Sequence, residues 1–137
     1  MSLPYVSSAL RRQIYERAAG RCEYCLLSAD DAFFPHEADH IIAEKHGGAT
    51  TADNLALACF DCNRFKGSDI ASLDPGTSDL VALFNPRTQR WNEHFSLDGG
   101  SITGLTPCGT ATLRLLKLNL PVRVEVREAL ISRGHYP

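Results

Sequence analysis

The chain has 137 residues, a formal net charge of −2 at pH 7 and a hydrophobic fraction of 44%. This length fits one domain, and this hydrophobic fraction can form a core, which argues against wholesale disorder. No apolar run approaches the roughly 20 residues of a membrane-spanning helix, and residues 1–15 lack the apolar block of a secretory signal. We therefore expect no membrane partner and a cytoplasmic location. The near-neutral net charge neither indicates nor excludes a nucleic-acid partner, because the local distribution of charged residues matters more than the net charge.

The first half of the chain predicts a helix followed by a strand–loop–strand–helix unit. A serine at position 7 or 8 can cap a helix that runs to about residue 19, where Gly20 ends it. Residues 37–43 predict a short strand, and a glycine turn at 47–48 separates it from a second strand over residues 54–59. A helix over residues 60–67 follows and ends at Gly67. This order of elements predicts a compact ββα unit.

The second half predicts an α+β segment that begins after a break at residues 74–76. Its expected elements are a strand over 80–84, a turn or short helix at 85–88, a hairpin of 91–97 and 101–105, and helices over 110–118 and 122–133. The alternating valines from 122 to 126 leave a strand possible for the last element. We divide the chain into a core, residues 1–70, and an α+β extension, residues 71–137, packed on it. The expected core of the extension is Trp91, Phe95, Ile102 and Leu105.

Four of the five cysteines form two matched C-x-x-C pairs, Cys22/Cys25 and Cys59/Cys62. Paired cysteines of this spacing in a reducing compartment indicate a metal site before a disulfide. Four thiolates satisfy the tetrahedral preference of Zn²⁺, and the segment between the pairs must then be a folded element held by the ion. Such a structural zinc contributes on the order of 10 kcal/mol to folding. The fifth cysteine, Cys108, is expected to be a small buried side chain.

The polar residues between and beside these pairs form a recognisable set. An Asp39-His40 pair stands on the first predicted strand, Asn54 opens the second, and Asn63 follows Cys62 on the helix. Over about residues 21–67, this pattern resembles the HNH (ββα-metal) endonuclease family. The resemblance implies an α+β fold with a zinc-clasped ββα core and metal-dependent hydrolysis of DNA phosphodiester bonds.

The resemblance also implies the role of each residue in the set. His40 would be the general base, Asp39 and Asn63 would hold the catalytic ion, and Asn54 would brace the loop that presents His40. Asn63 stands where the family often has histidine, and an oxygen ligand favours a harder metal, so we expect Mg²⁺ or Mn²⁺ there. One geometric condition must be met: neighbours on a strand point to opposite faces, so Asp39 and His40 can share a site only where the strand ends, twists or bulges.

Three further residues are candidates for contacts with nucleic acid: Arg64, Lys66 and His46. The alternative for the first two is a solvated helix face, and for His46 an ordinary loop position. The basic residues of the extension could likewise form a DNA-facing surface or merely solvate it. These are Arg87, Arg90, Arg114, Lys117, Arg123 and Arg127.

Several rival interpretations fit parts of the sequence. The run from His36 to His40 matches the H-E-x-x-H pattern of zinc proteases, but that chemistry needs both histidines on one helix face, and a strand would separate them by about 13 Å. His40 could be a structural histidine, Asn54 a turn residue and Asn63 a helix-surface amide. The main functional rivals are a non-catalytic zinc module that binds DNA or protein, and a nuclease that acts on RNA.

Overall fold

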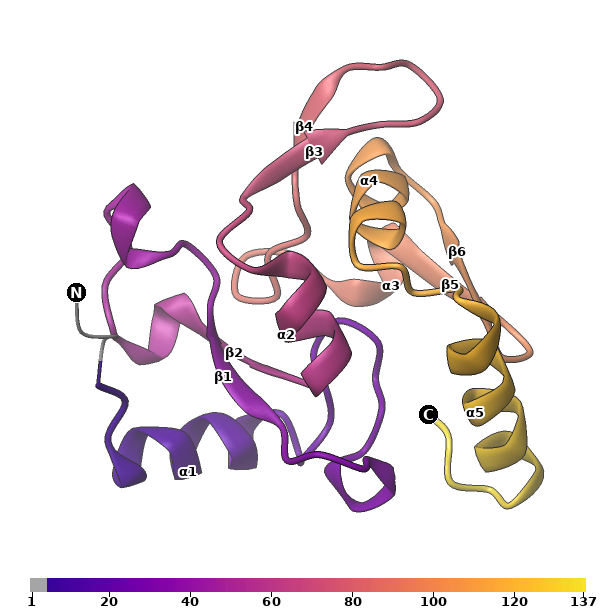
Figure 1. The fold of residues 1–137 in the computed structure, drawn as a ribbon, viewed down its shortest axis with the longest axis horizontal. Coiled ribbons are helices and arrows are strands. Elements are labelled where there is room, and N and C mark those ends of the chain that lie inside the picture. Colours follow the sequence, from indigo (N-terminus) through magenta and orange to yellow (C-terminus); the bar gives the residue numbers. More distant parts are fainter. Residues whose placement is uncertain (1–4) are drawn as a thin grey trace.

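The computed structural model describes residues 5–137, and its first half contains the expected ββα unit. Strands β1 (Glu37–His40) and β2 (Leu55–Ala58) form an antiparallel hairpin, and α2 (Phe60–Lys66) follows directly. The N-terminal helix α1 (Ser8–Arg17) packs against β2, and α2 packs against both strands (Figure 1). The α+β fold class and the order of these elements are thereby confirmed.

Local chemistry explains how α1 begins and where it is anchored. The Ser7 hydroxyl caps the helix by accepting a bond of 3.1 Å from the Leu10 amide. At the other end, the Arg17 guanidinium donates to the carbonyl oxygens of Ala52 and Leu55, at 2.8 and 2.7 Å. These bonds fix α1 to the segment that enters β2.

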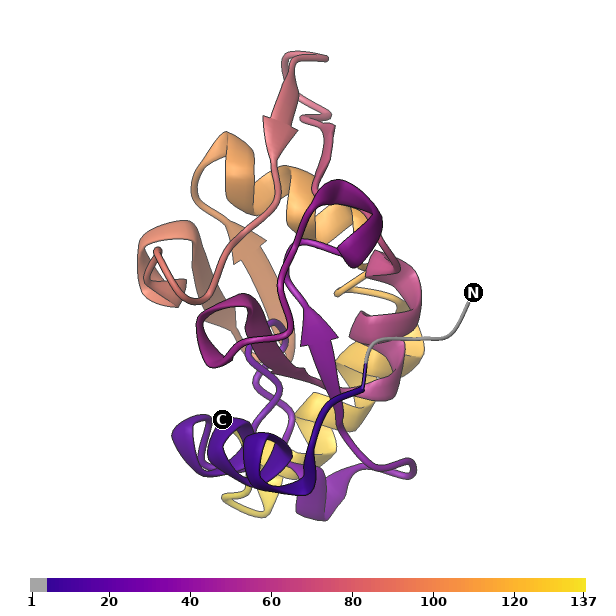
Figure 2. The same ribbon diagram turned by 90° about the vertical axis from the view of Figure 1, so that its left-hand side faces the viewer.

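The extension consists of two small hairpins and three helices. Its elements are β3 (Ala71–Leu73), β4 (Leu80–Ala82), α3 (Trp91–His94), β5 (Phe95–Asp98), β6 (Ser101–Gly104), α4 (Pro107–Leu115) and α5 (Pro121–Ser132). The β3–β4 hairpin projects from the rest of the molecule in both ribbon views (Figures 1 and 2). The two predicted C-terminal helices are confirmed, and the strand alternative for residues 122–126 is wrong.

Three expectations for the extension need correction. Strand β3 was not predicted, because three residues carry too little periodicity to stand out. Residues 91–94 form a helical turn instead of a strand, and the Trp91 indole there donates to the Tyr24 carbonyl oxygen at 2.9 Å. Leu105 lies beyond the end of β6 and is 53% exposed, so it is not a core residue.

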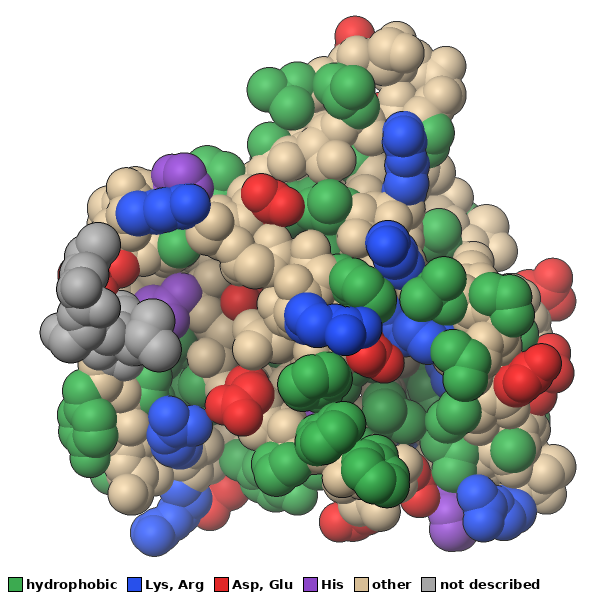
Figure 3. Space-filling view, viewed as in Figure 1, with side chains coloured by type: hydrophobic (Ala, Val, Ile, Leu, Met, Phe, Trp, Pro, Cys, Tyr) green, Lys and Arg blue, Asp and Glu red, His purple; other side chains and the backbone are tan. Residues whose placement is uncertain are grey.

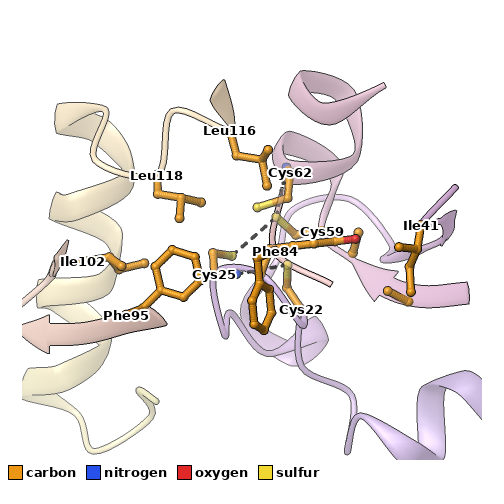
Figure 4. Packing of buried hydrophobic residues seen from close by; sticks show 13 residues of the cluster. Cys22, Cys25, Ile41, Cys59, Cys62, Phe84, Phe95, Ile102, Leu116 and Leu118 are labelled. Carbon is orange, nitrogen blue, oxygen red and sulfur yellow. Dashed lines mark hydrogen bonds between the residues drawn. The ribbon is translucent and has the colours of Figure 1, made fainter. Parts of the chain in front are cut away.

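The principal hydrophobic core joins the two halves of the chain. The four paired cysteines pack in it together with aromatic and aliphatic side chains of the extension (Figure 4). Those labelled in the figure are Phe84, Phe95, Ile102, Leu116 and Leu118. A smaller cluster, which includes Ile14, Leu55 and Leu57, fastens α1 to β2. The division near residue 70 therefore separates elements in sequence but does not separate two cores.

Within the described part of the chain, no helix has the length and apolar character needed to cross a membrane.

Candidate functional site

Four sulfur atoms lie close together in the principal hydrophobic core. The Sγ atoms of Cys22, Cys25, Cys59 and Cys62 all lie within 4.8 Å of one another, and all four residues are buried. Two sulfurs bound tetrahedrally to one zinc at 2.3 Å would lie about 3.8 Å apart, and the Cys25 and Cys59 sulfurs are 3.6 Å apart. The predicted four-cysteine metal cluster is thereby confirmed, and its donor set fits zinc.

The electrostatics of the sulfur cluster also favour a bound cation. Burial raises the pKa of the Cys22 and Cys62 thiols well above the usual value, because a buried thiolate without a counter-charge is unfavourable. Hydrogen bonds from the other cysteines lower the pKa of Cys25 and Cys59, so two of the thiols favour the thiolate and two oppose it, and a shared cation allows all four to be thiolates together. Each C-x-x-C turn is preorganised for this, because the amides of Cys25 and Cys62 point at the sulfurs of Cys22 and Cys59, both at 3.4 Å.

A guanidinium from the extension completes the surroundings of the cluster. Arg123, on α5, is buried, and its Nη2 lies 3.0 Å from the Cys62 sulfur and 3.8 Å from that of Cys59. Four thiolates around Zn²⁺ carry a net charge of −2, so a buried cation at this distance offsets part of it. Burial by itself lowers the pKa of Arg123, but the cysteine thiolates outweigh it and raise the pKa above its ordinary value.

We expect Arg123→Gln to speed the loss of zinc from the folded protein about tenfold or more, because charge-assisted hydrogen bonds contribute roughly 1.5–3 kcal/mol. The rate is measured as zinc transfer to a chromogenic chelator. Arg127→Gln is the matched control: Arg127 is also buried on α5, but it donates to the carbonyl oxygens of Gly100 and Leu118 and not to sulfur. Equal rates for the two variants would contradict a specific role of Arg123.

Three basic residues of the extension cannot contribute to the DNA-facing surface that the sequence left possible. Arg123 and Arg127 are buried, and Arg87 pairs with Glu23 at a site that is mostly hidden from solvent. None of the three guanidinium groups can therefore belong to a DNA-facing surface.

A groove of about 620 Å³ runs between the end of β1 and helix α2. Asp39 and His40 line it from β1, and Asn63 and Arg64 line it from α2. Asp39 and His40 can share a site only where the strand ends, twists or bulges, and β1 ends at His40. Both residues therefore border the same groove although they are neighbours in the chain. Asn63, which is distant from Asp39 and His40 in sequence, thus borders the same groove as they do.

His40 is half-buried, and its ring is oriented by a hydroxyl group. Its Nε2 lies 3.0 Å from Oγ1 of Thr50, in the loop between the two strands. Thr50 was not singled out from the sequence, because a threonine in a glycine-containing loop carries no distinctive signal. The contact leaves Nδ1 as the ring nitrogen available to a second partner.

Asp39 is buried, and its carboxylate is held by two groups that sequence analysis did not connect with it. The Tyr24 hydroxyl donates to Oδ2 at 2.8 Å, and the Lys66 ammonium lies 3.2 Å from the same oxygen. Oδ1 has only a longer contact of 3.4 Å to Lys66. Burial raises the pKa of Asp39, whereas Lys66 and Tyr24 act in the opposite direction.

Lys66 does not occupy the exposed helix face on which a phosphate contact was expected. Its side chain is 2% exposed, and its ammonium donates to the carbonyl oxygens of His40 and Ile41 at 3.0 and 3.2 Å as well as to Asp39. A buried ammonium with three acceptors has no free donor for phosphate. Lys66 instead ties the last turn of α2 to the end of β1.

Asn54 holds the loop that follows β1. Its Oδ1 accepts a bond of 3.0 Å from the Ile42 amide, and its Nδ2 donates to the carbonyl oxygens of Ile42 and Ala49 at 2.9 and 2.8 Å. Gly48 is required in the same loop, because an added Cβ would lie 1.7 Å from the Ile42 oxygen. The side chain of Asn54 therefore fixes the backbone directly beyond His40.

The remaining candidates occupy different surroundings. Arg64 is exposed at the edge of the groove, whereas His46 is exposed on the 3₁₀ turn Glu44–His46 and is not among the described residues that line the groove. His36 lies before β1, with Nε2 2.8 Å from the Leu27 carbonyl oxygen. Since the His36–His40 segment is extended and not helical, the zinc-protease interpretation is excluded.

Comparison with known proteins agrees with this geometry. Residues 22–69 match a family model described as HNH endonuclease. The matched segment includes all four clustered cysteines, both strands of the hairpin and α2. Neither a curated protein nor a solved structure gave a significant match.

Proposed function

We propose, from the match of residues 22–69 to the HNH endonuclease family model, that this protein is a metal-dependent endonuclease that hydrolyses DNA phosphodiester bonds. The observation that carries the proposal is the groove in which Asp39, His40 and Asn63 meet. Inside the segment that matches the family model, an imidazole and two oxygen donors border a groove that is open to solvent. A zinc module that only binds DNA or protein has no need of this combination.

In the proposed reaction, His40 is the general base. When Nε2 donates to Thr50, Nδ1 carries the lone pair that takes a proton from the attacking water. The bonds of Asn54 to Ile42 and Ala49 keep the loop beyond His40 in place, so the ring is oriented before substrate binds. A preoriented base avoids the loss of freedom that would otherwise add to the barrier.

The oxygen donors for a catalytic ion come from two elements. Asp39 offers Oδ1, which is the less engaged of its carboxylate oxygens, and Asn63 offers its amide oxygen from α2. Carboxylate and amide oxygens are the ligands that Mg²⁺ and Mn²⁺ prefer. When bound, the ion supplies positive charge to the phosphoryl oxygens and to the leaving oxygen. Arg64, at the edge of the groove, is placed to contact an adjacent phosphate.

A cleavage assay tests the proposal. Zinc-loaded protein should cut supercoiled plasmid in the presence of Mg²⁺ or Mn²⁺, should be inactive when EDTA removes the weakly held ion, and should recover when Mg²⁺ is restored. Zinc content is measured at each stage, so that loss of the structural metal is not mistaken for loss of the catalytic one.

The same assay separates the proposal from its two rivals. Digestion of an RNA of equal length, in parallel, identifies the nucleic acid that is cut. Cleavage of RNA alone would overturn the choice of DNA, and cleavage of neither by fully zinc-loaded protein would favour a non-catalytic binding module.

A further inference from the structure

Three phenylalanine rings form an exposed row beside the sulfur cluster. Phe33 and Phe34, in the loop before β1, are 94% and 48% exposed, and Phe60, the first residue of α2, is 40% exposed. The Phe33 and Phe34 ring centroids are 5.0 Å apart, and those of Phe34 and Phe60 are 4.6 Å apart. We call these three side chains the aromatic row. Hydrophobic side chains gather in the lower centre of the space-filling view, beside a hollow (Figure 3).

Contact of three adjacent aromatic rings with water costs free energy, and a ligand that covers the rings removes this cost. A contiguous apolar patch on a protein surface marks a binding site more often than single exposed hydrophobic side chains do. A shallow cavity of about 230 Å³ is lined by all three rings. The patch therefore offers both flat faces and a depression in which a planar group could lie.

Arg64 borders the aromatic row on the side of the groove, and Phe65, next to it on α2, has a second basic neighbour. The Arg64 guanidinium carbon lies 5.4 Å from the centre of the Phe60 ring and 4.7 Å from that of Phe65. The Lys117 ammonium lies 4.9 Å from the Phe65 ring. Rings next to cations are the arrangement with which proteins bind single-stranded nucleic acid, because the rings stack on bases and the cations attract the backbone.

The two acidic residues beside the aromatic row, Asp61 and Asp31, each lie near a basic side chain. Asp61 lies 3.6 Å from Arg64 and 4.0 Å from the guanidinium of Arg123. Asp31 lies 3.6 Å from His135. Arg64 is therefore paired with Asp61, and His135 offsets the charge of Asp31 only when its ring is protonated.

The Arg64 side chain links the aromatic row to the groove of the proposed active site. Arg64 lines the groove together with His40 and also lies over Phe60. Phe60 and Asn63 are three residues apart on α2, which is a rise of about 5 Å. One nucleotide of a stacked strand spans about 3.4 Å along the axis, so the row begins one or two nucleotides from a phosphate in the groove.

We propose that the aromatic row binds unpaired bases next to the phosphate that is cut, so that the substrate is DNA with a single-stranded segment, such as a flap or fork. This inference rests on the proposed function and narrows its substrate. In continuous duplex the base faces are covered by neighbouring base pairs, and exposed rings have nothing to stack on. A flap supplies free base faces at the required distance from the groove.

The test uses a DNA duplex with a 5′ flap whose first unpaired positions carry the fluorescent base 2-aminopurine. Binding is measured without divalent metal, to zinc-loaded protein, so that no cleavage intervenes. We expect quenching of the fluorescence by the wild type and tighter binding of the flap than of the plain duplex. Phe33→Ala and Phe60→Ala should each weaken flap binding about tenfold, which is about 1.4 kcal/mol, and leave duplex binding unchanged.

Two matched variants separate stacking from general effects. Phe33→Tyr keeps an aromatic face and should retain flap binding. Leu80→Ala removes a side chain that is 72% exposed on the β4 strand of the projecting hairpin, and it should bind as the wild type does.

The inference is overturned if the phenylalanine variants bind the flap as tightly as the wild type, or lose flap and duplex binding equally. It is also overturned if the wild type is a dimer that the variants dissociate, since the row would then be covered by a second copy of the chain. Failure of the proposed function has a different signature: quenching and the flap preference persist, but no DNA is cut when Mg²⁺ is added.

Discussion

His40→Ala should lower the rate of DNA cleavage by about 10²–10⁴-fold, the usual contribution of a general base. His40 stands at the end of β1, is half-buried, and has its ring positioned by Thr50, so its removal takes away the proposed proton acceptor without opening the core. Zinc content and thermal unfolding should stay those of the wild type. The measurement is the single-turnover rate of plasmid nicking at saturating Mg²⁺.

A histidine distant from the groove provides the control for that experiment. His135, near the C-terminal end of the structure, has a side chain that is 54% exposed and lies 3.6 Å from Asp31. His135→Ala should cut at the rate of the wild type. If His40→Ala cuts equally fast, a different group accepts the proton.

The double substitution Cys59→Ser with Cys62→Ser should leave the chain without zinc and largely unfolded at 25 °C. A structural zinc contributes on the order of 10 kcal/mol, which is comparable to the whole stability of a small domain, about 5–15 kcal/mol. The effect should reach the extension, because Phe95, Ile102 and Leu118 pack in the same cluster as the cysteines. Zinc content and the circular dichroism of both secondary and tertiary structure report the change.

Cys108→Ser supplies the comparison for the loss of a thiol. Cys108 is half-buried, and its sulfur has a weak contact of 3.9 Å to Gln89, outside the metal cluster. This variant should keep its zinc and its cooperative unfolding. A cysteine double variant that unfolds at the same temperature as Cys108→Ser would show that the metal contributes nothing to the fold.

The ββα unit was predictable because its signals are local. Two C-x-x-C pairs mark the metal ligands by spacing alone, and Ser7, Gly20 and Gly67 mark helix ends through their backbone preferences. The groove residues could be named from their order along the chain. The sequence could not predict that Asp39 and His40 border the same groove, because this depends on the residue at which β1 ends.

Two of the basic residues that sequence analysis misplaced, Lys66 and Arg123, share one physical cause. Lys66 and Arg123 lie on helices among other charged residues, where solvated side chains are the ordinary expectation. Each is buried because it meets an anion from a distant part of the chain, Asp39 in one case and the Cys62 sulfur in the other. Periodicity describes which face of a helix is apolar and gives no information about such long-range partners.

The ion pair between Lys66 and Asp39 limits how tightly the proposed catalytic site can hold Mg²⁺ by itself. A carboxylate with a permanent ammonium neighbour at 3.2 Å attracts an incoming cation less strongly than an isolated carboxylate does. The scissile phosphate brings the additional negative charge that makes occupancy favourable. Loading of the divalent ion and of nucleic acid should therefore be thermodynamically linked, so that each raises the affinity for the other by the same factor.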